Sequence, residues 1–114
     1  DQVPQKFKNR TLNFHNPTMT TMRTTPEENV AIAEFIAARL NPSRGPVVVM
    51  LPLGGLSTID RPGKIFYDPE ANGALFATLK LKLSSAIEII EDEHHLDDPE
   101  FAIRVGQQMV SLLK

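Results

Sequence analysis

The stretch Val47-Val48-Val49-Met50-Leu51, followed by Pro52-Leu53-Gly54-Gly55, decides the fold class. The first five residues are apolar and largely β-branched, which is typical of a parallel strand buried on both faces. Such a strand needs helices on both sides of its sheet, and helix-start patterns flank it in the sequence. It therefore predicts an α/β protein.

Three segments share a helix-start pattern: Thr25-Pro26-Glu27-Glu28, Asp68-Pro69-Glu70 and Asp98-Pro99-Glu100. Each combines an oxygen-bearing N-cap side chain, a proline at the first helical position and a glutamate in the first turn. Apolar residues recur at intervals of three or four behind each start. The pattern predicts three helices, the first of which ends before Asn41-Pro42.

Short strands are predicted at 11–14, 47–51 and 87–90, between and before these helices. The resulting order, β-α-β-α-β-α, implies a Rossmann-like or flavodoxin-like three-layer architecture with a mainly parallel sheet and right-handed crossovers. Three strands are fewer than the about five or six of an average sheet. We therefore expect either that the sheet edges pair with another chain or that strands are missing.

Composition excludes several classes of protein. The chain has 114 residues, enough for one domain, and a net charge of -2 without a basic stripe, which argues against nucleic-acid binding. It has no cysteine, so disulfides, thiol nucleophiles and cysteine metal sites are excluded. The uncharged run 46–56 is too short to cross a membrane, and residues 1–10 lack an apolar signal-peptide core. We expect a cytoplasmic protein, and its start at Asp1 suggests processing or a longer parent.

Ligands of open parallel sheets bind where the strands end. The segment 15–25, after the first predicted strand, holds five threonines and Arg23, whose guanidinium suits a phosphate or carboxylate. Arg23 could equally be a surface residue paired with Glu27 or Glu28, and His15-Asn16-Pro17 could simply form a turn. The candidate ligand-binding residues in this segment are His15, Asn16, Thr18, Thr21 and Arg23.

The connection after the second strand has about 16 residues, whereas two to six are usual. Gly54 and Gly55 would let a ligand approach the backbone, and Ser57 and Asp60 would supply hydrogen bonds. The alternative is an irregular surface loop whose glycines only make turns. Neither nucleotide-binding glycine fingerprint is present, and a triad of Ser57, Asp60 and His95 lacks the Gly-x-Ser-x-Gly context.

The connection after the third strand contains His94, His95, Asp97 and Asp98. Adjacent histidines of an extended segment point apart, and Asp98 is predicted to cap the following helix. No metal-ligand spacing is met, so a solvated acidic loop is favoured over a metal site. His95 remains a candidate acid–base group, with Asp60 or Asp98 to orient it.

Four segments together resemble one family, the tomato mosaic virus resistance protein-like family, which carries an ATP-binding domain. The resemblance runs in order from about Arg10 to the end of the chain. It is carried by His15-Asn-Pro-Thr-Met-Thr-Thr-Met-Arg-Thr-Thr25, Leu51-Pro-Leu-Gly-Gly-Leu-Ser-Thr-Ile-Asp60, Pro62-Gly-Lys-Ile-Phe-Tyr-Asp-Pro-Glu-Ala71 and His95-Leu-Asp-Asp-Pro-Glu-Phe-Ala102.

The resemblance implies that residues 11–114 form the Rossmann-like C-terminal lobe of a two-lobed domain and that residues 1–10 link it to a missing N-terminal lobe. In the complete protein it implies ATP with magnesium. The chain departs from the family pattern at Gly54, where many relatives carry arginine, and at Asp97, where most carry asparagine. Both departures remove positive or neutral groups near the implied phosphate site.

Three functions are therefore expected as alternatives. The first is a ligand-binding lobe for a nucleotide such as ATP or a small phosphorylated metabolite. The second is an enzyme acting on a small phosphorylated or carboxylated metabolite, with His95 as the acid–base group. The third is a protein-interaction scaffold, a homo-oligomer for example, whose exposed sheet edge pairs with a partner or with itself.

Overall fold

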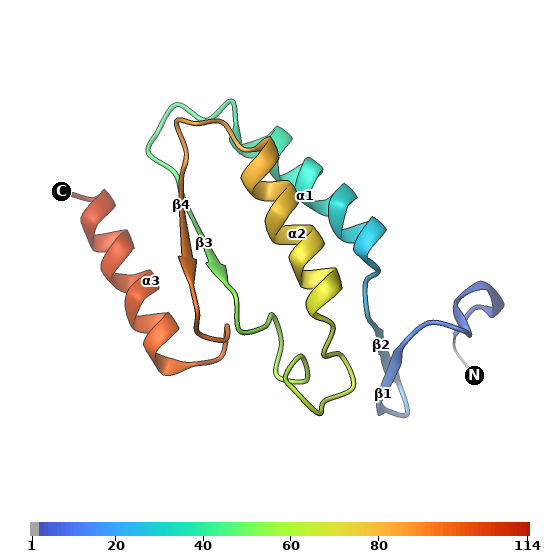
Figure 1. Cartoon of the computed structure of the whole chain (residues 1–114). Coiled ribbons are helices and arrows are strands. Elements are labelled where there is room, and N and C mark those ends of the chain that lie inside the picture. The colour runs from blue at the N-terminus through green and yellow to red at the C-terminus, as the bar shows by residue number, and fades with distance from the viewer. Residues whose placement is uncertain (1–2) are drawn as a thin grey trace.

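The structure is a computed structural model that describes residues 3–114, which form three α-helices, four strands and one short 3-10 helix. Figure 1 shows their arrangement. The elements in chain order are η1 (Gln5–Phe7), β1 (Leu12–Asn16), β2 (Met19–Met22), α1 (Pro26–Leu40), β3 (Val48–Pro52), α2 (Pro69–Lys82), β4 (Glu88–Asp92) and α3 (Pro99–Leu112).

Strands β3 and β4 pair in parallel, from Val48 opposite Glu88 to Pro52 opposite Asp92, and α2 connects them. Helices α1 and α2 lie on one side of this sheet and α3 lies on the other (Figure 1). Successive side chains of β3 point to opposite faces of the sheet. Leu51 packs in the core with α1 and α2, whereas Met50 lines a groove beside α3. The α/β class and the parallel strand are thus confirmed, but the strand is not buried on both faces, because residues 48–50 are only half-buried.

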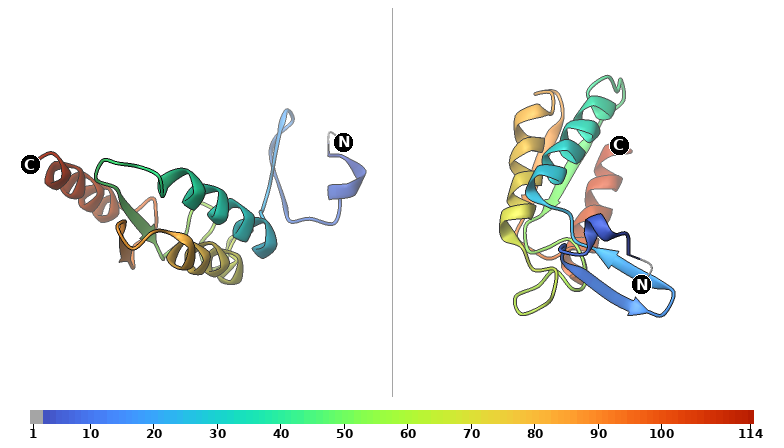
Figure 2. Two further views of the ribbon diagram at one scale, coloured as in Figure 1. Left: turned by 90° about the horizontal axis from the view of Figure 1, so that it is seen from above. Right: turned by 90° about the vertical axis from the view of Figure 1, so that its right-hand side faces the viewer.

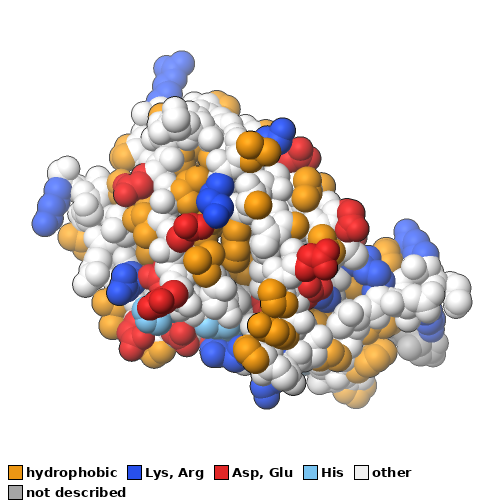
Figure 3. Space-filling model, in the orientation of Figure 1, with side chains coloured by type: hydrophobic (Ala, Val, Ile, Leu, Met, Phe, Trp, Pro, Cys, Tyr) orange, Lys and Arg blue, Asp and Glu red, His pale blue; other side chains and the backbone are white. Residues whose placement is uncertain are grey.

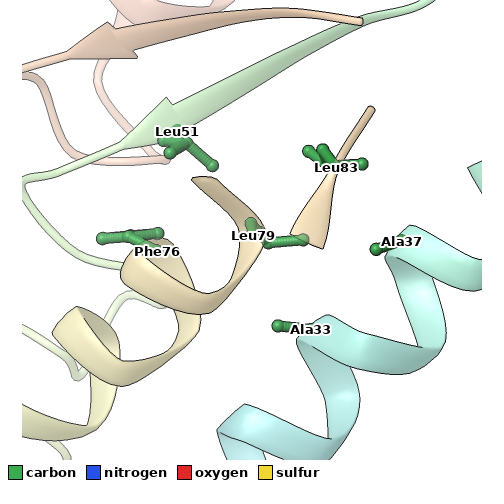
Figure 4. Close-up of a cluster of buried hydrophobic side chains, with 6 residues drawn as sticks. All are labelled: Ala33, Ala37, Leu51, Phe76, Leu79 and Leu83. Carbon is green, nitrogen blue, oxygen red and sulfur yellow. The ribbon is translucent and has the colours of Figure 1, made fainter. Parts of the chain in front are cut away.

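The apolar core lies between the sheet and the α1–α2 pair (Figure 4). The buried residues that α1 contributes to this apolar core are alanines. Their small size lets α2 approach closely and fill the core with larger side chains. The buried members are Ala33, Ala37, Leu51, Phe76, Leu79 and Leu83.

The predicted β-α-β-α-β-α order is wrong at its first strand. Residues 12–16 pair antiparallel with β2, with Leu12 opposite Met22, and do not join the β3–β4 sheet. The Asn16 Oδ1 atom accepts hydrogen bonds from the backbone N–H and the hydroxyl of Thr18, both at 2.9 Å, and so closes a tight turn. A turn closed within the segment costs less chain entropy than distant pairing, and the hairpin projects from the rest of the molecule (Figure 2).

The three helix starts are confirmed, but their caps differ. Thr25 and Glu28 form both hydrogen bonds of a capping box, and Asp68 accepts a hydrogen bond from the Ala71 N–H at 3.0 Å. The side chain of Asp98 makes no cap bond to α3, contrary to expectation. It accepts instead from the backbone N–H of His95 at 2.9 Å, so it orders the loop before the helix.

The α3 side of the sheet is loosely covered. Val105 and Met109 are 42% and 58% exposed although their spacing predicts a core-facing stripe. Apart from its chain neighbours and the nearby backbone of α3, no atom of residues 3–114 lies within 4 Å of the position that a Cβ on Gly106 would take. No helix formed by these residues has the length and apolar character needed to cross a membrane.

Candidate functional site

A buried polar network joins the segment before α1 to the loop after β3. The Arg23 guanidinium donates to the side-chain carbonyl of Asn72 at 2.6 Å and to the backbone carbonyl of Asp68 at 3.3 Å. Asn72 in turn donates to Asp60 Oδ2 at 2.7 Å, and the Leu56 N–H donates to the same oxygen at 2.9 Å. The amide of Asn72 thereby bridges the two charges, whose direct N–O distance is 3.6 Å.

A pocket of about 240 Å³ lies beside this network. Three of its residues each carry one buried polar atom that has no hydrogen-bond partner among the described residues: Arg23 Nε, Ser57 Oγ and Asp60 Oδ1. An unsatisfied buried polar atom costs about 1–3 kcal/mol, so three on residues that line one pocket are costly unless a ligand or water satisfies them. The pocket is lined by Met22, Arg23, Thr24, Leu56, Ser57, Asp60 and Phe66.

The two glycines after β3 lie against the loop after β4. The Gly54 N–H donates to the carbonyl of His94 at 3.1 Å, and the Gly55 carbonyl accepts from the Leu96 N–H at 3.0 Å. A Cβ on Gly54 would meet the backbone nitrogen of His95 at 2.7 Å, and one on Gly55 would meet the His95 ring at 2.6 Å. The neighbouring loop therefore occupies the space that the sequence assigned to a ligand.

Both ring nitrogens of His95 are engaged. Nδ1 accepts from the Asp97 N–H at 2.9 Å and from the Arg61 guanidinium at 3.2 Å, while Nε2 donates to the Ser57 carbonyl at 2.7 Å. The residue is only 3% exposed. This pattern fits an imidazole that carries its proton on Nε2. His95 holds the backbone of Ser57 in place and presents no ring nitrogen to a substrate.

Four of the candidate residues lie on the projecting hairpin, away from the pocket. His15 is exposed on β1, and Asn16 and Thr18 are used by the turn. The Thr21 hydroxyl is 3.5 Å from the Asn13 carbonyl across the strand pair. The structure brings together Arg23, Ser57 and Asp60 at the pocket, whereas Gly54 and Gly55 lie against the loop after β4.

Arg23 is not a surface residue paired with Glu27 or Glu28, the alternative that its sequence position allows. Glu28 pairs with Arg10 at 2.5 Å, and the guanidinium of Arg10 also holds the Arg23 carbonyl at 2.7 Å. The hydrogen bond from Arg10 is the main reason that the pKa of Glu28 is lowered. Arg10 thus supports the backbone at Arg23 and leaves the Arg23 side chain to the pocket.

A second polar cluster follows β4 and is partly open to solvent: the side chain of Asp92 is buried, whereas those of Glu100 and Arg104 are exposed. His94 Nδ1 lies 2.6 Å from Asp92 Oδ1, and His94 Nε2 lies 2.8 Å from Glu100 Oε2. The hydrogen bond to Asp92 raises the pKa of His94, and hydrogen bonds from His94, first that of its backbone N–H, lower the pKa of Asp92. Arg104 Nε lies 3.4 Å from Asp92 Oδ2. Figure 3 shows histidine, acidic and basic side chains gathered at the lower left, where β4 leads into α3.

The described residues do not fit a magnesium–triphosphate group. No set of three or more His, Asp or Glu side chains within residues 3–114 is placed to hold a metal ion. The pocket has one positive and one negative side chain, and no glycine-rich phosphate loop lies beside it. We derive no step through Mg-ATP at this site.

Asn72 is the site residue that sequence reasoning missed. It lies on the buried face of α2, four residues before Phe76 and seven before Leu79, and is only 6% exposed. An amide in an apolar helical stripe is a signal, because a buried amide needs hydrogen-bond partners. Its partners, Arg23 and Asp60, are 49 and 12 residues away in the chain.

Comparison with known proteins places the chain in a family. The family model described as the C-terminal domain of an uncharacterised protein family (UPF0261) matches residues 1–113. A UPF0261 protein of Clostridium tetani is 38% identical over 115 residues, which cover 100% of this chain and 28% of that protein. A UPF0261 protein of Rhizobium meliloti is 41% identical over 104 residues, 90% of this chain and 26% of the relative.

The ToMV resistance protein Tm-1(GCR237) of Solanum lycopersicum is 40% identical over 102 residues, which cover 88% of this chain and 14% of that protein. The chain thus spans about a quarter or less of the length of these relatives. The resemblance to the resistance proteins is confirmed. The chain belongs to the UPF0261 family and corresponds to its C-terminal domain.

Proposed function

We propose that this chain is a ligand-binding lobe of a longer protein that binds a nucleotide or a small phosphorylated metabolite. The observation that carries the proposal is the pocket beside Arg23, Ser57 and Asp60, with three unsatisfied buried polar atoms. The pocket lies beyond the carboxyl end of β3, where ligands of open α/β sheets bind. Arg10, Asn72 and His95 fix its polar groups before a ligand arrives.

The geometry favours binding over catalysis. His95, the acid–base candidate of the enzyme alternative, has both ring nitrogens engaged and is buried. A general base must reach the proton that it removes, directly or through one water. His95 does not meet this requirement, because both of its ring nitrogens are already engaged by protein groups.

A ligand titration monitored by two-dimensional NMR tests the proposal. AMP, Mg-ATP and ribose 5-phosphate are added separately to the protein labelled with ¹⁵N. We expect at least one of them to shift the amide signals of Ser57, Asp60 and Phe66, and Arg23→Ala to weaken that binding at least tenfold. Arg39→Ala is the matched control, because Arg39 lies at the far end of α1, over the Phe35 ring. Unchanged pocket signals with all three compounds would refute the proposal.

A second candidate function, protein interaction, is supported by the α3 side of the sheet. A groove of about 380 Å³ runs between α3 and β3, lined by apolar side chains such as Met50, Phe101 and Met109. The radius of gyration is 16.0 Å, whereas about 13 Å is typical of a compact chain of 100 residues. Because the relatives are three to four times longer or more, we propose that another segment of the same longer polypeptide covers this groove.

Light scattering of the 114-residue chain tests whether the groove is covered by another segment of the longer polypeptide or by a second copy of this chain. We expect a monomer, because the covering segment would not be present. A dimer that Met109→Glu dissociates would instead assign the groove to a second copy and contradict the proposal. Glu100→Gln is the control, since Glu100 lies on the same helix outside the groove lining.

A further inference from the structure

The charges at the pocket cancel. Arg23 carries the one positive and Asp60 the one negative side chain of its lining, and the other lining residues are neutral. Their side chains are 11% and 2% exposed, so solvent screens neither charge well. A phosphate dianion placed here would meet the buried carboxylate at close range, where like charges repel most strongly. The pocket is therefore poorly suited to a phosphate.

The unsatisfied atoms specify what a ligand must offer. Arg23 Nε is a donor only, ionised Asp60 Oδ1 is an acceptor only, and Ser57 Oγ is both. The dianion of a phosphate monoester can accept from Arg23 and Ser57 but has no proton to donate to Asp60. A pair of neighbouring hydroxyl groups can do all three, because each hydroxyl donates one hydrogen bond and accepts others.

The size and the walls of the pocket agree with a sugar ring. Its volume of about 240 Å³ is below the 300–1,000 Å³ range of sites for drug-sized ligands, so it suits one ring better than a complete nucleotide. The apolar side chains of Met22, Leu56 and Phe66 line it beside the polar atoms. A furanose or pyranose ring has the matching combination of an apolar face and a hydroxylated edge.

We infer that this pocket binds the vicinal hydroxyl groups of a sugar, such as the ribose of a nucleotide or the pentose of a sugar phosphate, and leaves the phosphate outside the pocket. The inference rests on the proposed function and names the part of the ligand that this chain recognises. Asp60 and Ser57 are then the residues that discriminate hydroxylated from deoxygenated ligands. The single buried arginine offsets the charge of Asp60 and positions its carboxylate through Asn72.

Paired ligands test this inference separately from the proposed function. The affinities of AMP, 2′,3′-dideoxy-AMP and inorganic phosphate are measured by NMR titration of the ¹⁵N-labelled chain, with ribose 5-phosphate and 2-deoxyribose 5-phosphate as a second pair. We expect the hydroxylated member of at least one pair to bind at least tenfold more tightly than its deoxy partner, because a site built to bond a hydroxyl rejects the analogue without it. We also expect inorganic phosphate to leave the signals of Ser57 and Asp60 unchanged.

Variants identify the discriminating atoms. Asp60→Asn replaces an acceptor by a group that can donate, and it should lower the affinity for AMP at least tenfold while changing that for dideoxy-AMP less than twofold. Ser57→Ala, which removes an unpartnered hydroxyl, should act in the same direction and serves if Asp60→Asn does not fold. Thr58→Ala is the control, because its hydroxyl binds Asp97 outside the pocket.

Equal affinities within each pair, or Ser57 and Asp60 signals that move with inorganic phosphate, would overturn the inference and leave the proposed function standing. Absence of binding by every compound would remove both.

Discussion

Two polar clusters lie at the same edge of the sheet, one beyond β3 and one beyond β4, and they handle charge differently. In the first, Asp60 is 1% exposed and an amide separates it from Arg23. In the second, the side chains of Glu100 and Arg104 around His94 are 70% and 59% exposed. The first, buried cluster depends on the hydrogen bonds between its own side chains, whereas Glu100 and Arg104 of the second, more open cluster can exchange their partners for water. The single ion pair of the first cluster is therefore expected to affect stability more than the three ion pairs of the second.

The largest effect should come from Gly55, on which the buried cluster depends. It has a φ of 138°, and a Cβ there would collide with the Asp60 carbonyl as well as with the His95 ring. We expect Gly55→Ala to lower the free energy of unfolding by about 3 kcal/mol or more, from strain and overpacking together. Urea denaturation monitored by circular dichroism measures this free energy for the parent chain and the variant.

Gly63→Ala is the matched control for that variant. Gly63 has a φ of 84° but no atom of the described chain lies within 4 Å of its Cβ position. Gly63→Ala should therefore lower the free energy of unfolding only by the backbone strain, about 1–2 kcal/mol. An equal loss in the two variants would mean that the contacts of Gly55 with Asp60 and His95 add nothing.

The next largest effect should come from breaking the buried charge pair. Asp60→Asn leaves the guanidinium of Arg23 without its counter-charge, and removing one partner of a buried pair costs about 3–5 kcal/mol. Because Arg23 keeps 11% exposure and two carbonyl acceptors, we expect about 2–3 kcal/mol. A double-mutant cycle with Arg23→Met should give a coupling energy above about 1 kcal/mol. Additive losses would show that the two side chains act independently.

The smallest effect should come from the open cluster and should depend on pH. The raised pKa of His94, ordinarily 6.5, means that its contribution is fully present below pH 6.5 and is lost as the pH rises through the raised value. The lowered pKa of Asp92, ordinarily 3.8, means that its contribution is present above pH 3.8 and is lost as the pH falls through the lowered value. The ion pair therefore stabilises the fold most between these two ordinary values.

Unfolding experiments over this range sharpen the comparison of the clusters. We expect the free energy of unfolding to fall from about pH 6 to about pH 9, and His94→Gln to flatten that slope. Added salt should reduce the slope in the parent chain, because Glu100, one of the two carboxylates that pair with His94, is 70% exposed. A slope that persists in His94→Gln would assign the titration to another group.

Much of the fold could be predicted from the sequence because its signals are local. The capping oxygens of Thr25 and Asp68 and the prolines after them start helices through contacts within one turn. The β-branched run before Pro52 forms a strand of a parallel pair, as its residue types favour. The family resemblance, carried by the segments around Arg23 and Asp60, is confirmed by the comparisons.

Errors arose where a strand or side chain has two possible partners. The sequence of residues 11–14 does not indicate whether they pair with the parallel sheet or with the segment that follows. In the structure the turn at Asn16 lets them pair with the following segment. Asp98 had two possible donors, the helix N–H groups and the loop N–H of His95, and only the folded loop shows which it takes. The same uncertainty placed His15 and Thr21 beside a pocket that they do not reach.

By itself the sequence determined the helices, the buried strand and the residue types available at the ends of the strands, because each of these depends on neighbours within a few positions. Only the tertiary structure decided that Asn72 joins Arg23 to Asp60, that His95 is a support for the Ser57 backbone, and that the glycines admit a loop. These contacts span 12 to 49 residues of chain. A hydrogen bond is set by distance and direction in space, which periodicity along the chain does not encode.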